Sequence, residues 1–266
     1  MGKILLLIGV CWSLLINVVH GQTNSTIADS TIYAYLKQIN YWSSYYKNAG
    51  YDNDSLMAAN VKLMQYLKHI TQLKESIYYA LPQSEAAGLI NITASNAQLR
   101  AYAWDSWLST DMHYFNQIIQ YRNADTAAVT ILNDIADTTQ HAAPGAYFTE
   151  INVCTTQNNT TVYLLTDCTI ASNNLKASGI KAYAVKDGKL TEYPIFKTKN
   201  HLNNSIEFVY EAAYDAATAL TQYIHFSTDK KQLFIPVVEA DRQLKKAYWV
   251  YEFNGNNYVY KKKMKS

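Results

Sequence analysis

The hydrophobic periodicity of the chain changes once, near Gly88, and this change limits the possible folds more than any other feature. Over residues 32–86, apolar side chains recur at the spacing of one helix face. Over residues 88–262, apolar and polar residues alternate along a series of short segments, as they do in half-buried β-strands. The sequence therefore predicts an α+β protein, with an N-terminal helical region followed by a large antiparallel β domain.

Two dipeptides of the β region predict tight hairpins. Asp187-Gly188 and Asn254-Gly255 each stand between alternating segments, and both turn positions of such a hairpin favour residues that accept a positive φ. Strands that follow one another without intervening helices are typical of an antiparallel meander. We expect the meander to close in a propeller-like array; the alternative is a β-sandwich.

The N-terminus has the pattern of a secretory signal peptide over residues 1–21. Lys3 precedes an apolar run from Ile4 to Ile16, and a segment of small residues ends at Gly21. We expect export to the periplasm or the extracellular space. The polar stretch 22–31 is expected to be a leader, and no later run is long enough to span a membrane in the mature chain.

Charge and motifs exclude several classes of function. The formal net charge is only +2, which gives no electrostatic case for nucleic-acid binding. The sequence lacks GxSxG, HExxH, CxxC and phosphate-loop motifs, and its histidines have no metal-ligand spacing. We therefore expect no cofactor and no metal, and we favour a protein that is not an enzyme.

Cysteine usage fits an exported chain. Cys154 and Cys168 form an even pair once the signal peptide is removed, and an oxidising compartment favours a disulfide between them. A tight turn at Asn158-Asn159 would instead place Cys154 opposite Tyr163. We predict the disulfide, on the condition that a wider loop or a neighbouring strand brings the sulfurs together.

The segment from 99 to 122 holds the candidate site. Asp105 ends one expected strand and Asp111 begins the next, beside two tryptophans. Carboxylates at strand ends beside indole rings can bind sugars or act as general acid and base. Alternatively, such Asp residues accept backbone amides in a turn. The predicted binding residues are Trp104, Asp105, Trp107, Asp111 and His113.

The same segment resembles a family of uncharacterised exported bacterial proteins. Those proteins have a helical N-terminal part and a segment similar to FRIYSWDTxTGGTMHFF, which matches residues 99–106 and 112–115 here. This chain has Leu108-Ser109 where that family has two glycines. The resemblance extends to later segments such as YEFNGNNY at 251–258. It implies an exported protein of this architecture and no particular activity.

Together these features predict a secreted or periplasmic β-rich protein that binds a polysaccharide or a protein at the cell envelope. The 23 tyrosines against 7 phenylalanines agree with a recognition surface. One alternative is a hydrolase of an envelope or dietary polymer that uses Asp105, Asp111 or Glu150 as acids. A second alternative is an inhibitor or immunity-type protein.

Overall fold

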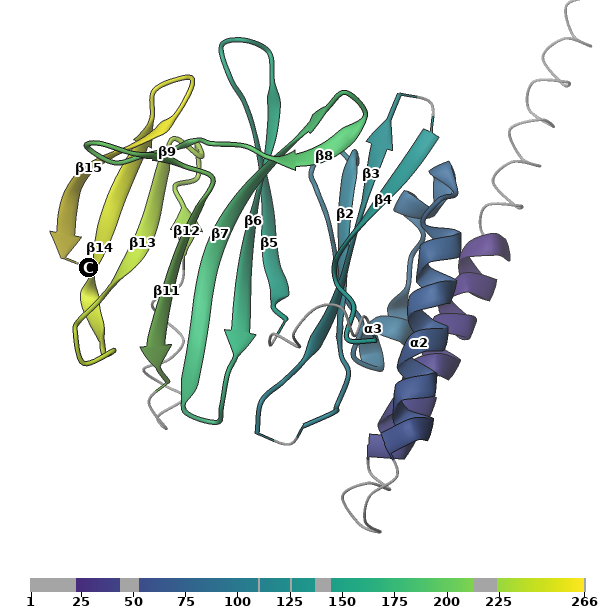
Figure 1. Cartoon of the computed structure of the whole chain (residues 1–266). Helices are drawn as coiled ribbons and strands as arrows, with labels where there is room; N and C mark the ends of the chain where they lie inside the picture. The colour runs from purple at the N-terminus through teal and green to yellow at the C-terminus, as the bar shows by residue number, and fades with distance from the viewer. Residues whose placement is uncertain are drawn as a thin grey trace, which may run out of the picture.

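The protein is built from four layers, a helical layer followed by three β-sheets stacked face to face (Figure 1). The computed structural model describes residues 23–43, 53–109, 111–124, 126–136, 145–212 and 224–265. The helices precede the strands in the chain, and nearly all strand pairs are antiparallel. The predicted α+β class with antiparallel sheets is therefore confirmed. The predicted signal peptide, residues 1–21, lies outside the described residues.

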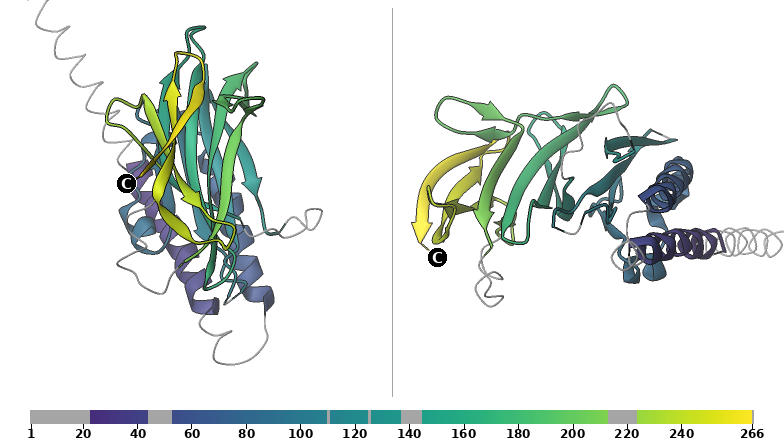
Figure 2. Two further views of the ribbon diagram at one scale, coloured as in Figure 1. Left: turned by 90° about the vertical axis from the view of Figure 1, so that its left-hand side faces the viewer. Right: turned by 60° about the horizontal axis from the view of Figure 1, so that its bottom comes forward.

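The helical layer covers one face of the first sheet (Figure 2). It consists of a helix over residues 23–43, α2 (Asn53–Ile70), the 3-10 helix η1 (Lys74–Tyr78) and α3 (Pro82–Ala86). The apolar stripes of the two long helices pack on Tyr102 and Trp104 of the sheet. No helix in these described ranges combines the length and apolarity needed to cross a bilayer.

The stretch expected to be a polar leader is instead helical from residue 23 onward, so that expectation is corrected. Asp29 lies within it and is buried. The Asp29 carboxylate accepts hydrogen bonds from the backbone amides of Gln83 at 3.0 Å and Ser84 at 2.9 Å. The Asp29 side chain therefore binds the start of α3 and does not mark a linker.

Each sheet consists largely of consecutive strands. The first sheet contains β1 (Ile90–Thr93), β2 (Leu99–Asp105), β3 (Phe115–Asn123) and β4 (Thr126–Asn133), in that order. The second sheet contains β5 (Tyr147–Thr155), β6 (Thr161–Ile170), β7 (Leu175–Lys186) and β11 (Ser205–Glu211) in the order β11-β7-β6-β5, with β8 (Lys189–Glu192) also paired to β7.

The third sheet lies at the end of the stack that is farthest from the helices (Figure 1). It contains β9 (Phe196–Lys197), β10 (Leu202–Asn203), β12 (His225–Phe226), β13 (Gln232–Val238), β14 (Leu244–Phe253) and β15 (Tyr258–Lys265) in the order β10-β9-β15-β14-β13-β12. Its β15–β9 pair is parallel, in contrast to the antiparallel pairs around it.

The central strand of the second sheet, β6, is buried on both faces, because this sheet lies between the other two. On β6, Val162 and Leu164 pack toward the third sheet, whereas Tyr163 and Leu165 pack toward the first. Strand β3 is likewise buried over residues 115–121, as its two half-apolar faces predict. The sheets thus stack in series, and a propeller-like closure stays a prediction.

The two predicted hairpins form with different turns. Asp187 and Gly188 both have positive φ, 49° and 75°, as a two-residue turn requires. At the β14–β15 connection only Gly255 has a positive φ, 96°. There Asn254 Oδ1 accepts hydrogen bonds from the backbone amides of Asn256 and Asn257, so the loop is wider than a two-residue turn.

The predicted disulfide is wrong, because the strand register separates the two cysteines. Cys154 pairs with Val162, whereas Cys168 lies six residues further along β6 and pairs with Tyr147. At about 3.4 Å per residue this is roughly 20 Å, whereas a disulfide needs Cα atoms within about 7 Å. Both thiols are free.

Candidate functional site

Three of the five predicted site residues meet at the end of β2. Asp105 Oδ1 accepts a hydrogen bond from the Trp107 amide at 2.9 Å, and Asp105 Oδ2 contacts Nδ1 of His113. The His113 ring lies edge-on to the Trp107 ring, with centroids 5.6 Å apart. Asp105 therefore accepts a backbone amide in the turn, which was the alternative to a sugar-binding role.

This Asp105–His113 pair also connects two sheets. The His113 backbone N–H donates to the carbonyl of Ile170, the last residue of β6, at 3.1 Å. Trp107 adopts a positive φ of 57° in the turn, and a non-glycine residue reaches this region only where its surroundings stabilise it. The contacts to Asp105 and His113 supply that stabilisation.

The other two predicted site residues lie apart from this group. Trp104 is fully buried under α2, and its indole N–H donates to Asn60 Oδ1 at 3.0 Å. No indole face is left on which a sugar could stack. Asp111 is exposed. Its backbone amide donates a long hydrogen bond to Ser109 Oγ at 3.4 Å.

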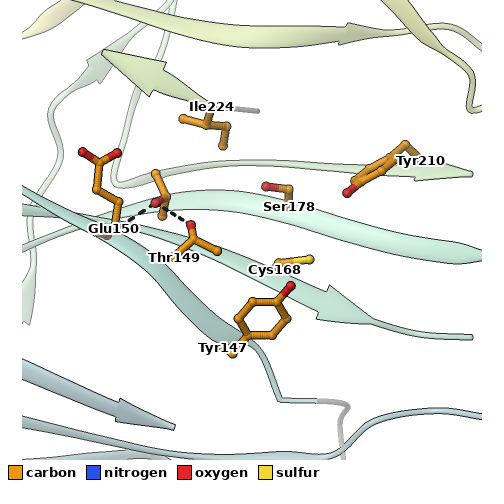
Figure 3. A pocket seen from close by; sticks show the side chains of 8 residues that line it. Tyr147, Thr149, Glu150, Cys168, Ser178, Tyr210 and Ile224 are labelled. Atoms are coloured by element: carbon orange, nitrogen blue, oxygen red, sulfur yellow. Dashed lines mark hydrogen bonds between the residues drawn. The ribbon is translucent and has the colours of Figure 1, made fainter. Parts of the chain in front are cut away.

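A cavity of about 400 Å³ lies on the second sheet, on the face that is turned toward the third sheet (Figure 3). Strands β5, β6, β7 and β11 supply most of its wall. The lining residues are Tyr147, Thr149, Glu150, Thr166, Cys168, Ser178, Tyr210 and Ile224. Glu150 is the one of these that the sequence marked as a candidate, as an acid of the hydrolase alternative.

A β-bulge explains why neighbouring residues of β5 line the same cavity. Phe148 pairs with Asp167, but the next pair is Glu150 with Thr166, so Thr149 is the extra residue. In a regular strand, consecutive side chains point to opposite faces, and a bulge re-aims one of them. Thr149 and Glu150 thus both reach the cavity, and Thr149 Oγ1 lies 2.8 Å from Thr166 Oγ1.

The inner end of the cavity is polar but uncharged. Figure 3 shows the hydroxyl of Tyr147 directed toward the sulfur of Cys168, with Ser178 and Tyr210 on the strands beside it. Burial raises the pKa of the Cys168 thiol, although the hydroxyls of Tyr147 and Tyr210 oppose the shift. The thiol is therefore protonated at neutral pH and is a poor nucleophile.

Glu150 occupies the other end of the cavity. Its carboxylate lies on the side of Ile224 and away from Tyr147 (Figure 3), and the residue is exposed. A single exposed carboxylate can orient a polar ligand at the entrance. Catalysis by a carboxylate pair would need a second acid, and among the described residues of the lining Glu150 is the one acidic side chain.

A buried amide follows the cavity along β5. Asn152 pairs with Leu164 and lies two residue pairs beyond Glu150 and Thr166, on the same face of the sheet. It is 3% exposed, and its Nδ2 has no acceptor within the described part of the chain. A buried donor without an acceptor is costly, and such groups commonly serve a bound water or ligand.

Aromatic contacts join the cavity to the Asp105–His113 pair. The His113 ring stacks on Phe115 with centroids 6.2 Å apart, and Phe115 contacts Tyr147 at 5.0 Å. The predicted site residue His113 therefore supports the Tyr147 wall of the cavity from outside, through Phe115. The sequence could not show the cavity itself, because most of the lining residues come from four different strands and their arrangement depends on the bulge in β5.

The fold and the site define an α+β protein of stacked, mainly antiparallel sheets with a hydroxyl-lined cavity on the second sheet. A comparison with protein-family models finds no match, and a comparison with curated proteins finds no significant similarity. The resemblance to exported bacterial proteins stays a prediction. Within the described ranges, no group of three or more His, Cys, Asp or Glu side chains is placed to hold a metal ion.

Proposed function

We propose that this protein is an exported, non-enzymatic binding protein that takes the end or a branch of a cell-envelope polysaccharide into the cavity of the second sheet. The observation that carries the proposal is the lining: two tyrosines with the hydroxyls of Thr149, Thr166 and Ser178 around a space of about 400 Å³. Export rests on the pattern of residues 1–21.

This lining suits a sugar better than other small ligands. Aromatic rings offer a surface for the C–H face of a sugar ring, and hydroxyls can both donate and accept hydrogen bonds. The volume lies within the range of small-molecule sites, which is about 300–1,000 Å³. A pocket of this size also favours a saccharide unit over a folded protein partner, which would need a much larger contact surface.

An oligosaccharide array, followed by titration calorimetry with the retained glycans, tests the proposal. We expect the wild-type protein to retain at least one glycan. Tyr147→Phe and Tyr210→Phe each remove one hydroxyl from the cavity and should weaken its binding roughly three- to tenfold, the value of one hydrogen bond. The matched control is Tyr78→Phe, because Tyr78 is exposed on η1.

Two results would contradict the proposal. One is an array that retains no glycan on folded wild-type protein, and the other is wild-type affinity in both cavity variants. The hydrolase alternative names Glu150 as an acid, so the retained glycans should also be incubated with the protein and examined for new reducing ends. Cleavage would replace the binding function with that alternative. The inhibitor or immunity-type function stays a prediction.

A further inference from the structure

An aromatic surface separate from the cavity lies on the third sheet. It is formed by Trp249, Tyr260 and Lys263, and we call it the Trp249 surface. The Tyr260 ring lies edge-on to the Trp249 ring, with centroids 5.7 Å apart. The Lys263 ammonium lies 5.4 Å from the centroid of the Trp249 ring. Trp249 is 36% exposed, whereas Tyr251, two residues further along the same strand, is 7% exposed.

A bulge in β15 creates this grouping. Tyr260 pairs with Tyr251, but Lys262 pairs with Val250 and Lys263 with Trp249, so Lys261 is the extra residue. Without the bulge, side chains three positions apart would point to opposite faces of the sheet. The bulge places Tyr260 and Lys263 on the side of Trp249, so an aromatic platform and a cation lie next to each other.

The surroundings of the Trp249 surface are strongly basic. Strands β14 and β15 and the loop between them hold six lysines and one acidic residue, Glu252, although the whole chain has a net charge of only +2. Lys245 contacts Glu239, and Lys261 lies 3.8 Å from Glu252. The other four have no acidic partner among the residues that the structure describes, and all are exposed: Lys246, Lys262, Lys263 and Lys265.

Protection of the sheet edge explains part of this charge. β15 pairs with β9 only at Tyr258 and Val259, so its remaining length forms an edge within the described chain (Figure 1). Lysines on an edge strand prevent pairing with another chain. They do not require an exposed indole beside them, so Trp249 needs a separate explanation.

We propose that the Trp249 surface binds an anionic segment of a polysaccharide. The C–H face of a sugar ring stacks on the indole, and its carboxylate or sulfate pairs with Lys263 and with the lysines next to it on β15. An acidic peptide fits less well, because an extended strand would pair along the β15 edge and leave the indole unused. This proposal is independent of the cavity.

Affinity electrophoresis through gels that contain one polymer tests the proposal. We expect dextran sulfate or polygalacturonate to retard the wild-type protein, dextran not to, and added salt to weaken the effect. Trp249→Ala should weaken the binding roughly tenfold and Lys263→Gln roughly threefold. Lys189→Gln, which removes an exposed lysine from β8 of the second sheet, should have no effect.

The outcomes distinguish binding at the Trp249 surface from binding in the cavity and from nonspecific attraction between charges. Tyr147→Phe and Tyr210→Phe should bind the anionic polymer as the wild type does, whatever they do to the glycans of the array. Wild-type retardation of a Trp249→Ala variant with an unchanged circular dichroism spectrum would overturn the proposal. Equal retardation by polyglutamate would also overturn it, in favour of a surface that recognises charge alone.

Discussion

A single buried side chain on α2, Asn60, decides the role of Trp104. Asn60 is 1% exposed; its Oδ1 accepts the indole N–H of Trp104, and its Nδ2 donates to the carbonyl of Ser106 at 3.1 Å. A buried indole N–H needs such a partner. The sequence presents Asn60 as one polar residue beside an apolar helix stripe, with nothing to show that it reaches another layer.

Replacing Asn60 therefore affects stability more than a surface amide would. Asn60→Ala leaves the Trp104 N–H and the Ser106 carbonyl buried without this partner and opens a small cavity. We expect the free energy of unfolding to fall by about 3 kcal/mol, measured by urea denaturation. Asn173→Ala, at an exposed site, should change it by less than about 0.5 kcal/mol. A loss below about 1 kcal/mol for Asn60→Ala would contradict this role.

At the scale of elements, the helix α3 depends on a residue far away in the sequence. α3 has five residues, and its N-cap position, Leu81, provides no side-chain hydrogen bond. The Asp29 carboxylate binds the free amides of Gln83 and Ser84 instead, and it also accepts the Ser84 hydroxyl at 2.7 Å. An acceptor at a helix N-terminus stabilises the orphan amides of its first turn.

Asp29→Ala should release α3 from the first helix. We expect the free energy of unfolding to fall by about 2 kcal/mol, with faster amide hydrogen exchange over residues 83–87. The matched control is Glu75→Ala, which removes an exposed carboxylate from η1. Unchanged exchange in α3 would show that other contacts hold it in place.

The order of the elements was predictable, but the exact pairing of the strands was not. The alternation of Arg100, Tyr102 and Trp104 with Leu99 and Ala101 follows from the local sequence, and the two sets do face different layers. Local patterns do not show which strand receives an extra residue. The bulges at Thr149 and Lys261 shape the cavity and the Trp249 surface, so neither site could be found from the sequence.

At the scale of the whole molecule, stability is distributed over three interfaces between layers, and each interface buries a tyrosine. Tyr102 lies between the helices and the first sheet, Tyr183 between the first and second sheets, and Tyr258 between the second and third. Burial raises the pKa of Tyr102 and of Tyr183 to about 12, and it also raises the pKa of Tyr258.

These shifts predict unfolding at alkaline pH. In the unfolded chain the tyrosines titrate near pH 10, whereas in the folded protein Tyr102 and Tyr183 keep their protons to about pH 12. Their contribution is constant below pH 10, and stability is lost from pH 10 to 12 because the unfolded state releases protons first. Urea denaturation across this pH range should show the loss of stability, and tyrosinate absorbance should show the buried tyrosines ionising over the same range.

Tyr102→Phe separates titration from packing. The variant loses the hydrogen bond from the Tyr102 hydroxyl to Gln120 Oε1, which is 3.0 Å long, so it should be less stable at pH 8 by about 1 kcal/mol. It should also lose stability less steeply above pH 10, because one buried group no longer titrates. Two results would contradict this account: an unchanged loss of stability with pH in Tyr102→Phe, or full ionisation of the tyrosines while the protein stays folded. Either would mean that the layers separate, or admit water, independently of one another.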